Sequence, residues 1–457
     1  MTAERNEFQW RRHPDAEAWV AARLAQLEAR LPLTSTWAAD LQRRTSSRLV
    51  DWIDHIVVAA GPKPQADLIE LGWEREKTPT APNHTAYHHP GARLPRILLY
   101  DQDELPPGDT VSAAIQVEEV ERFLAKNQLA APVEGDANGP YRRATFGREG
   151  GRRLQVVERR GYAGFVPVQT APESLERAQR AWEQWTTRPR VFTDEQAGME
   201  QTLTLARRLA DDLGVDTAAW LVFAAERDFW ESRNRAGQIQ KARQDDMGLG
   251  WANHDHHTFR SSRECFFLLI QILETLGFRC RERFYAGAEA GWGAQVLEQP
   301  VCRLTVFADV DLSPEEVDGD FAHTHLPPRT DLGTVGLWCA LHGQSMLSAG
   351  LHHLACLLDF ETATEDLAQQ DVGMMRPFSD FSYLRQAFTQ GERWTIAPER
   401  LERLTASGLI DVDKAALFAE KGAIGSHLEN IQRGEGFKGF NQTTISDIIR
   451  RTDPRRE

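Results

Sequence analysis

The stretch HDHHTFRSSRECFFLLIQILETLGFRCRERFY, residues 254–285, decides the expected fold of the later part of this chain. It begins with a strand-like run, HHTFR. An apolar run with the spacing of an amphipathic helix follows, with Ser261 or Ser262 as its N-cap. Three further β-like runs come next: RCRERFYAG (279–287), AQVLEQ (294–299) and CRLTVFADV (302–310). A strand, a helix and three strands make a βαβββ order, which predicts one half of an α+β fold.

A weak internal repeat relates this segment to an earlier one. The earlier segment runs IELGWEREK and then HTAYHHPGARLPRILLYDQDEL, and the later one runs LETLGFRCRERFYAG and then AQVLEQPVCRLTVFADVDL. Both have a helix that ends in leucine, glycine and an aromatic residue, then an Arg-Glu strand, an apolar strand and an acidic-leucine stop. A repeated half-fold is the simplest interpretation, and chance similarity of two αβ segments is the alternative. We therefore expect paired βαβββ halves.

The rest of the chain divides by composition. Amphipathic helices broken at Pro32 form a lead-in, and a stretch rich in Ala, Arg, Glu, Gln and Trp forms a helical bridge between the halves. After Pro314 the chain becomes loop-rich and then mostly helical. The expected units are a helical lead-in (1–50), a first αβ half (51–170), a helical bridge (171–250), a second βαβββ half (251–312) and a loop-rich, helical C-terminal region (313–457).

Composition limits the classes of function. The chain has 457 residues, 41% hydrophobic and 26% charged, and no apolar run approaches the ~20 residues that span a bilayer. A net charge of −14 disfavours a dispersed nucleic-acid-binding surface. The first residues are charged and lack the apolar centre of a secretory signal. We therefore expect a cytoplasmic protein without a nucleic-acid or membrane partner.

Residues 254–257 group three histidines and one aspartate in four positions. Because alternate side chains of a strand share a face, His254 and His256 are expected on one face and Asp255 and His257 on the other. Imidazole suits Zn, Fe, Cu and Ni, so this concentration favours a metal site. The alternative is a loop entering a strand, with histidines that are solvated or hydrogen-bonded to the backbone.

Other histidine pairs give weaker signals. His323 and His325 lie in a Pro-rich loop, where solvated side chains are expected. Neither H-x-H-x-D-H nor H-E-x-x-H, the strings of familiar zinc hydrolases, is present. His352 and His353 lie on an apolar, helix-like stretch, where we expect satisfied core or helix-surface histidines.

Two isolated residues complete the candidate metal set. His55 interrupts the apolar strand WIDHIVVAA, and Glu158 follows two valines in LQVVERRGY. A lone acid at a strand end is usually solvated or paired, here with Arg159 or Arg160. With a histidine of HDHH, however, these residues would make two imidazoles and one carboxylate, the facial triad that leaves three positions of Fe(II) open. Since no phosphate-binding glycine loop and no G-x-S-x-G elbow occurs, metal-dependent chemistry is the remaining prediction.

At this point the residues suggest a family. The segment DHHTFRSSRECFFLLIQILETLGFRCRERFY resembles the first metal-binding segment of the 2-oxoadipate dioxygenase/decarboxylase family, also called hydroxyglutarate synthases, in the vicinal oxygen chelate superfamily. That family has a histidine followed four positions later by an arginine, and here the pair falls on His256 and Arg260. The string WANHD resembles the family's second histidine segment, which puts His254 in competition with His256.

Two further segments carry the resemblance. RRLQVVERRGYAGFVP is similar to the family's glutamate strand and points to Glu158, and the tail RGEGFKGFNQTTISDII is similar to a C-terminal segment of plant-like members. In the family the glutamate comes last, whereas Glu158 precedes the HHTFR segment here. Either the halves are permuted, or Glu298 in AQVLEQP takes the place of Glu158.

The resemblance implies a glyoxalase-like fold and a mononuclear Fe²⁺ enzyme with His55, His256 and Glu158 as ligands. It implies a 2-oxoadipate-like 2-oxo acid that binds through its carboxylate and keto oxygens. O₂ would then drive oxidative decarboxylation to a hydroxy acid and CO₂. Arg260 would hold a substrate carboxylate with a charge-assisted fork, or else pair with Asp255. Two alternatives stay open: a non-catalytic relative that binds a small molecule, and a zinc-dependent hydrolase or isomerase on the same scaffold.

Overall fold

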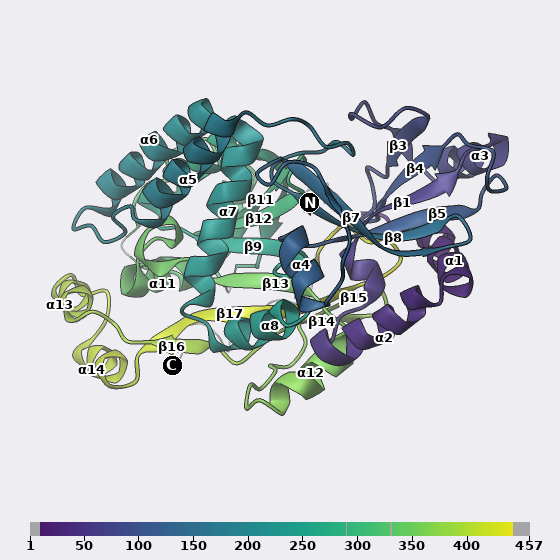
Figure 1. The fold of residues 1–457 in the computed structure, drawn as a ribbon. Coiled ribbons are helices and arrows are strands. Elements are labelled where there is room, and N and C mark those ends of the chain that lie inside the picture. The colour runs from purple at the N-terminus through teal and green to yellow at the C-terminus, as the bar shows by residue number, and fades with distance from the viewer. Residues whose placement is uncertain (1–9, 289, 330, 442–457) are drawn as a thin grey trace.

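The computed structural model describes residues 10–288, 290–329 and 331–441, and two curved β-sheets dominate it (Figure 1). The first sheet has the strand order β2-β3-β4-β1-β5-β8-β7-β6. It consists of two βαβββ modules joined by antiparallel pairing of β1 with β5. The first module is β1 (Ile53–Ala59), α3 (Pro62–Glu70), β2 (Glu74–Arg75), β3 (His84–His88) and β4 (Arg96–Tyr100). The second is β5 (Thr110–Gln116), α4 (Val120–Lys126), β6 (Val133–Glu134), β7 (Tyr141–Glu149) and β8 (Arg152–Arg159).

The second sheet repeats this plan, with the order β10-β11-β12-β9-β13-β17-β15-β14 and β16 paired to β17. Antiparallel pairing of β9 with β13 joins its two modules. The first is β9 (His254–Arg260), α9 (Arg263–Thr275), β10 (Arg279–Tyr285), β11 (Trp292–Gln299) and β12 (Leu304–Asp311). The second is β13 (His353–Leu357), α12 (Phe360–Ala368), β14 (Ser379–Phe381), β15 (Leu384–Phe388) and β17 (Ala423–Arg433), with β16 (Glu392–Trp394) inserted before β17.

The repeated half-fold expected from the sequence is therefore confirmed by topology. β4 runs parallel to β1 as β12 runs parallel to β9, and β8 runs parallel to β5 as β17 runs parallel to β13. Strands β1, β5 and β8 thus correspond to β9, β13 and β17. The chain is an α+β protein with paired βαβββ halves.

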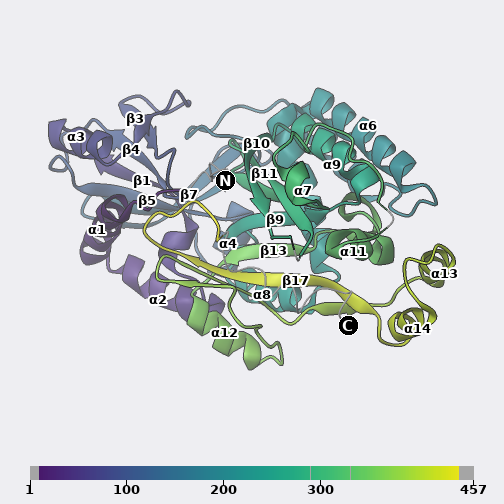
Figure 2. The ribbon, with the colours of Figure 1, turned by 180° about the vertical axis from the view of Figure 1, so that it is seen from behind.

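Helices cover the outer faces of both sheets (Figure 2). The lead-in helices α1 (Pro14–Arg30) and α2 (Leu33–Thr45) pack on the first sheet, and Pro32 separates them as expected. The expected helical bridge is present as α5 (Pro172–Thr186), α6 (Glu195–Leu213), α7 (Val215–Glu231) and α8 (Arg235–Asp245). The C-terminal region adds α10 (Pro314–Val317), α11 (Thr334–His342), α13 (Pro398–Ala406) and α14 (Val412–Lys421).

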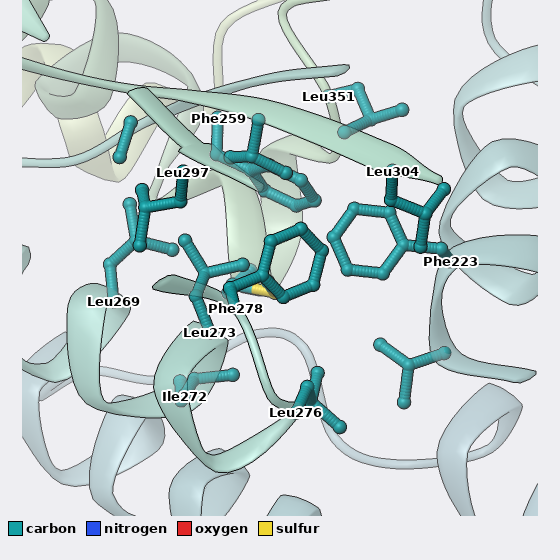
Figure 3. Close-up of a cluster of buried hydrophobic side chains, with 14 of the residues drawn as sticks. Phe223, Phe259, Leu269, Ile272, Leu273, Leu276, Phe278, Leu297, Leu304 and Leu351 are labelled. Carbon is teal, nitrogen blue, oxygen red and sulfur yellow. The ribbon is translucent and has the colours of Figure 1, made fainter. Parts of the chain in front are cut away.

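The largest core lies between the second sheet and the bridge helices (Figure 3). Phe223 of α7 packs between two other phenylalanines, with ring centroids 5.7 Å from Phe259 of β9 and 4.9 Å from Phe278. All three side chains are buried. Burying one such ring contributes about 1.5–3 kcal/mol, so this layer holds the outer face of β9 firmly. The opposite face of β9 is left for polar side chains.

The C-terminal region differs most from the sequence expectation. The sequence analysis anticipated loops and helices after Pro314, and the structure adds β13 to β17 to those helices. Residues 353–357, interpreted as helix-like, form the buried strand β13. An apolar run of this length is compatible with either element, and its position between β9 and β17 decides for a strand. Within the described ranges, no helix has the length and apolar character that a membrane span requires.

Candidate metal centre

The centre is built on three neighbouring strands of the second sheet. His256 comes from β9, His353 from the first residue of β13, and Glu429 from β17. All three side chains are almost fully buried. The two Nε2 atoms lie 3.4 Å apart, and each lies 3.2 Å from Oε2 of Glu429. Three donor atoms that are distant in the sequence thus meet at one point.

These distances fit a single metal ion. Ligand atoms at about 2.0–2.2 Å from a metal and at right angles to one another lie about 3 Å apart. Among the described residues, only two groups bring three such donor atoms within 4.8 Å of one another, and this is the buried one. The other, Glu274 with Cys280 and His323, is exposed. The Thr258 hydroxyl also lies 2.8 Å from Nε2 of His353 and would give way to an ion there.

A second layer of side chains orients the donors. Nδ1 of His256 lies 2.9 Å from Oδ1 of Asp255. Arg433 holds that aspartate with a two-pronged contact, Nε to Oδ2 at 2.7 Å and Nη2 to Oδ1 at 3.0 Å. Nε2 of Gln386 donates to Oε1 of Glu429 at 2.8 Å, which leaves Oε2 for the centre. A carboxylate behind a histidine fixes its tautomer and raises its basicity, as in carboxylate–histidine–metal triads.

The charges of the centre are strongly coupled. Burial lowers the pKa of His256, but Glu429 and Asp255 outweigh it and raise the pKa to about 9. Burial raises the pKa of Glu429, but His256 and His353 bring it down to about 2. Burial dominates at His353 and lowers its pKa to about 4. The carboxylate is therefore ionised at neutral pH and His353 presents a neutral imidazole, whereas His256 carries a proton that a metal would have to displace.

The same face of the sheet carries Arg260, four residues after His256 on β9. Its Nε lies 3.7 Å from Oδ2 of Asp309 on β12, and its guanidinium lies over the Trp338 ring, 5.5 Å from the ring centroid. Burial raises the pKa of Asp309 to about 7 against the opposing effect of Arg260. The positive charge of Arg260 is thus only partly balanced by Asp309 near neutral pH.

Aromatic rings enclose the imidazoles. Phe307 and Phe440 lie 5.0 Å and 5.1 Å from the His256 ring, and Phe388 lies 4.9 Å from the His353 ring. Apolar walls lower the local dielectric and strengthen the electrostatic interactions inside. The centre is therefore a dry polar site within an apolar surround.

The structure does not bring His55 and Glu158 to His256. Nδ1 of His55 lies 2.7 Å from Asp54 in the first sheet, and the ring packs on Phe165. Glu158 lies on the face of β8 opposite to Arg159. There the Val120 amide donates to its Oε2 at 3.0 Å, and Arg160 pairs with its Oε1. Neither residue belongs to a group of three candidate ligands among the described residues.

The alternative ligands of the sequence analysis lie elsewhere. Between His254 and His257, β9 carries one more residue than the partner segment of β13, and this bulge breaks the alternation that would align His254 with His256. His254 instead lines a cavity between the two halves. His257 faces Arg227, with Nε2 at 3.3 Å from Nη1. Glu298 pairs with Lys438 at 3.1 Å.

His353 and Glu429 were the residues that sequence reasoning missed. The helix-like reading of the apolar run LHHLACLLDF concealed His353, and the expectation of a helical C-terminal region concealed Glu429. One signal was available: QVVER at 155–159 and ENIQR at 429–433 both place an arginine four residues after an amide or acid, with a glycine two residues after the first arginine and one residue after the second. The final segment resembling the family's C-terminus is described only to Asn441, and the remainder lies outside the described residues.

Comparison with known proteins gives matches in structure only. No protein-family model matches the chain, and no curated protein matches it. A triple mutant of 4-hydroxymandelate synthase from Streptomyces coelicolor matches with 12% identity over 89% of this chain and 99% of that chain, at a TM-score of 0.30. A methylmalonyl-CoA epimerase from Mycobacterium tuberculosis matches with 13% identity over 40% of this chain and 89% of that chain, at 0.23.

A fusion of a xylose isomerase-like TIM barrel with 4-hydroxyphenylpyruvate dioxygenase matches with 10% identity over 95% of this chain and 57% of that chain, at a TM-score of 0.24. The class of fold rests on the strand order itself. Two sheets, each made of two βαβββ modules joined through their first strands, define a paired, glyoxalase-like fold.

Proposed function

We propose that this protein is an Fe(II)-dependent dioxygenase that acts on a small 2-oxo acid, with His256, His353 and Glu429 as the metal ligands. The observation that carries the proposal is the meeting of two imidazole Nε2 atoms and one carboxylate oxygen within 3.2–3.4 Å of one another. Two histidines and one carboxylate on one face of an ion are typical of non-haem Fe(II) oxygenases. His256 keeps the role expected from the sequence, while His353 and Glu429 stand in place of His55 and Glu158.

The donor set argues against a structural zinc site, but iron oxygenases and hydrolytic zinc enzymes share it, so the O₂-uptake test below separates the two metals. Structural zinc sites use four ligands, commonly with thiolates, and hydrolytic zinc sites have three ligands and one open position. Here the three donors lie on one side, with neighbouring strands β12 and β15 contributing Phe307 and Phe388 rather than a fourth donor. Bound Fe(II) would supply three open positions, two for chelation by a 2-oxo acid and one for O₂. The order of the ligands, two histidines and then a glutamate, also removes the discrepancy with the 2-oxoadipate dioxygenase/decarboxylase family.

Arg260 is the residue that we propose to hold the substrate carboxylate. It is buried and lies on the same face of β9 as His256. A guanidinium binds a carboxylate through two parallel hydrogen bonds, which orients the acid as well as attracting it. The surrounding aromatic rings exclude water from the same space.

The test is anaerobic purification, loading with Fe(II), and measurement of O₂ uptake with a panel of 2-oxo acids that includes 2-oxoadipate. We expect uptake with at least one acid, with release of one CO₂ per O₂ consumed. Arg260→Gln should raise KM for that acid at least tenfold, whereas Arg279→Gln, on an exposed position of β10, should leave KM unchanged. Absence of uptake with every acid, or turnover supported by zinc without O₂, would overturn the proposal.

A further inference from the structure

Two adjoining cavities lie between the halves, and the larger one reaches Arg433 and Phe440, which contact Asp255 and His256 of the candidate metal centre. Their volumes are about 820 Å³ and 340 Å³, and His254, Cys302 and Arg303 line both. None of the three proposed metal ligands lines either cavity. The function proposed above therefore leaves this space without a role.

The walls of the smaller cavity are basic although the chain is acidic. Six arginine or lysine side chains line it against three carboxylates, while the whole chain has a net charge of −14. A cavity of one sign within a low-dielectric wall focuses its field and attracts the opposite charge. The ligand chemistry favoured by this cavity is an anion.

Arg227 is the most informative of these side chains. It comes from α7, is 5% exposed, and contacts His257 through Nη1 at 3.3 Å. Its Nε is buried and has no hydrogen-bond partner among the described residues, and it forms no ion pair with a described carboxylate. Burial lowers its pKa, with only partial compensation from Glu118 and Asp228. A buried guanidinium without a counter-charge is unfavourable unless an anion accompanies it.

Arg303 contributes a second charge, which shares its counter-charge with another arginine. Its Nη1 lies 3.2 Å from Oδ1 of Asp54, but Arg159 already grips both oxygens of that carboxylate at 2.8 Å. One aspartate therefore serves two guanidiniums. Burial lowers the pKa of Arg303 to about 10. The wall that the two cavities share therefore carries excess positive charge.

His254 adds a directed polar atom. Its Nδ1 is buried and has no hydrogen-bond partner in the described part of the chain. The bulge in β9 turns this ring away from the metal centre and into the wall that the cavities share. Arg227, Arg303 and His254 thus come from α7, the β11–β12 connection and β9, and they converge on one space.

We propose that the space between the halves, lined by Arg227, Arg303 and His254, is a binding site for a small oxyanion, a phosphate or a dicarboxylate. Two guanidiniums and an imidazole match the charge and donor geometry of such groups. Because Arg303 also contacts Asp54 of the first half, the bound anion would link the two halves. The site is separate from the metal centre, so it would take a second ligand rather than the reacting acid.

The test is isothermal titration of the full-length, metal-loaded protein with inorganic phosphate in one arm and malonate in the other. We expect saturable binding of one equivalent in at least one arm, and the arm that binds identifies the class of oxyanion. Arg227→Gln should weaken it at least tenfold, and Arg303→Gln should weaken it in the same direction. Arg208→Gln, an exposed arginine on α6, is the matched control and should bind as the wild type does.

Glu429→Ala separates this site from the metal centre, because binding should persist in that variant. No saturable binding in either arm would overturn the proposal. So would equal affinity of the Arg227, Arg303 and Arg208 variants, or loss of binding in Glu429→Ala. If Arg227→Gln fails to fold by circular dichroism, Arg303→Gln decides the outcome.

Discussion

The two sheets of this protein share a set of supporting residues, here called the frame: an Asp-His pair on the first strand and an arginine on the last. They differ in the other side chains that lie beside the histidine. In the first, Nδ1 of His55 meets Asp54 at 2.7 Å, and Arg159 binds that aspartate through two contacts. In the second, His256 meets Asp255 at 2.9 Å and Arg433 binds that aspartate in the same way. The Asp-His pair on the first strand and the arginine on the last strand are therefore present twice.

The chain after each arginine repeats the match. Nη1 of Arg159 donates to the carbonyl of Gly164, and the next residue, Phe165, packs on His55 with 5.0 Å between centroids. Nη1 of Arg433 donates to the carbonyl of Gly439, and the next residue, Phe440, packs on His256 at 5.1 Å. A loop arginine of each half also contacts the frame aspartate of the other half. Arg303 lies 3.2 Å from Asp54, and Arg93 lies 3.2 Å from Asp255.

The difference lies in the other two donors. In the first sheet, the residue after His55 pairs with Ala113 of β5, and in the second, the residue after His256 pairs with Leu354 of β13. Ser112 precedes Ala113 as His353 precedes Leu354, so Ser112 occupies the position that corresponds to His353. Gln155 precedes Arg159 by four residues, as Glu429 precedes Arg433. The first sheet thus offers an imidazole, a hydroxyl and an amide where the second offers two imidazoles and a carboxylate. The comparison teaches that the frame orients a histidine in both halves, and that the candidate metal centre differs from its counterpart in the two other donors.

The largest expected effect separates the two framed histidines. His256→Ala should abolish stoichiometric iron binding and O₂ uptake, because it removes one of three donors. His55→Ala, the matched control, should keep both, since His55 belongs to no group of three His, Cys or carboxylate ligands in the part of the chain that the structure describes. Elemental analysis after anaerobic loading measures the result. Iron retained in His256→Ala and lost in His55→Ala would place the ion in the first sheet.

The helical layer over the second sheet provides the next prediction. Glu226 of α7 is fully buried between Arg188 and Arg190, at 2.8 Å and 2.7 Å, and those arginines also donate to the carbonyls of Met346 and Leu347. Glu226→Gln should lower the free energy of unfolding by about 3–5 kcal/mol, because it leaves buried guanidiniums without a counter-charge. Glu121→Gln, at a half-exposed partner of Arg142, should cost about 0–1 kcal/mol. If urea unfolding gave equal losses of unfolding free energy for Glu226→Gln and Glu121→Gln, the expected difference between the buried and the half-exposed ion pair would be wrong.

Glu226 also predicts an acid sensitivity. Burial raises its pKa, but Arg190 and Arg188 outweigh it and lower the pKa to about 2 from an ordinary value of 4.5. A depressed carboxyl pKa adds stability above the unfolded pKa and loses it as the pH falls through the folded pKa. Wild-type stability should therefore fall between pH 4.5 and about 2, and Glu226→Gln should flatten that part of the curve. An unchanged slope in the variant would contradict this role.

A smaller effect is expected behind the histidines. Asp255→Asn should weaken iron binding about 10- to 100-fold, because it removes the acceptor that orients His256. Asp54→Asn is a closely matched control, since Asp54 is equally buried and bound by two arginines. We expect both variants to lose similar stability and only Asp255→Asn to lose iron affinity. Competition with a chelator measures the affinity, and equal affinities would show that the aspartate does not act through His256.

The weakest expected effect is a gain in the first sheet. Ser112→His combined with Gln155→Glu would restore the donor set of the second sheet beside His55. We expect a second, more weakly bound metal equivalent, detected by titration with Co(II). Ser112→Ala combined with Gln155→Ala is the control and should bind only one equivalent. No second equivalent in a folded double variant would show that the frames differ by more than their donors.

The sequence predicted the frame better than the centre. The βαβββ order, the repeat and the bridge follow from local spacing. The pair His256 and Arg260 came from the resemblance to a family, whereas strand alternation placed His254 with His256, which the bulge in β9 prevents. His353 and Glu429 could not be found in this way, because they join the site only through the pairing of β13 with β9 and of β17 with β13. Strand pairing of this kind is set by contacts between segments that are distant in the sequence. A short apolar run, taken without its pairing partner, is equally compatible with a helix or a strand.

The most direct test of the account compares two glutamates. Wild type, Glu429→Gln and Glu158→Gln are loaded anaerobically with Fe(II), freed of unbound metal, checked for folding by circular dichroism and analysed for iron. We expect one iron per chain in the wild type and in Glu158→Gln, and a large loss of iron in Glu429→Gln. Iron retained in Glu429→Gln and lost in Glu158→Gln would contradict the account.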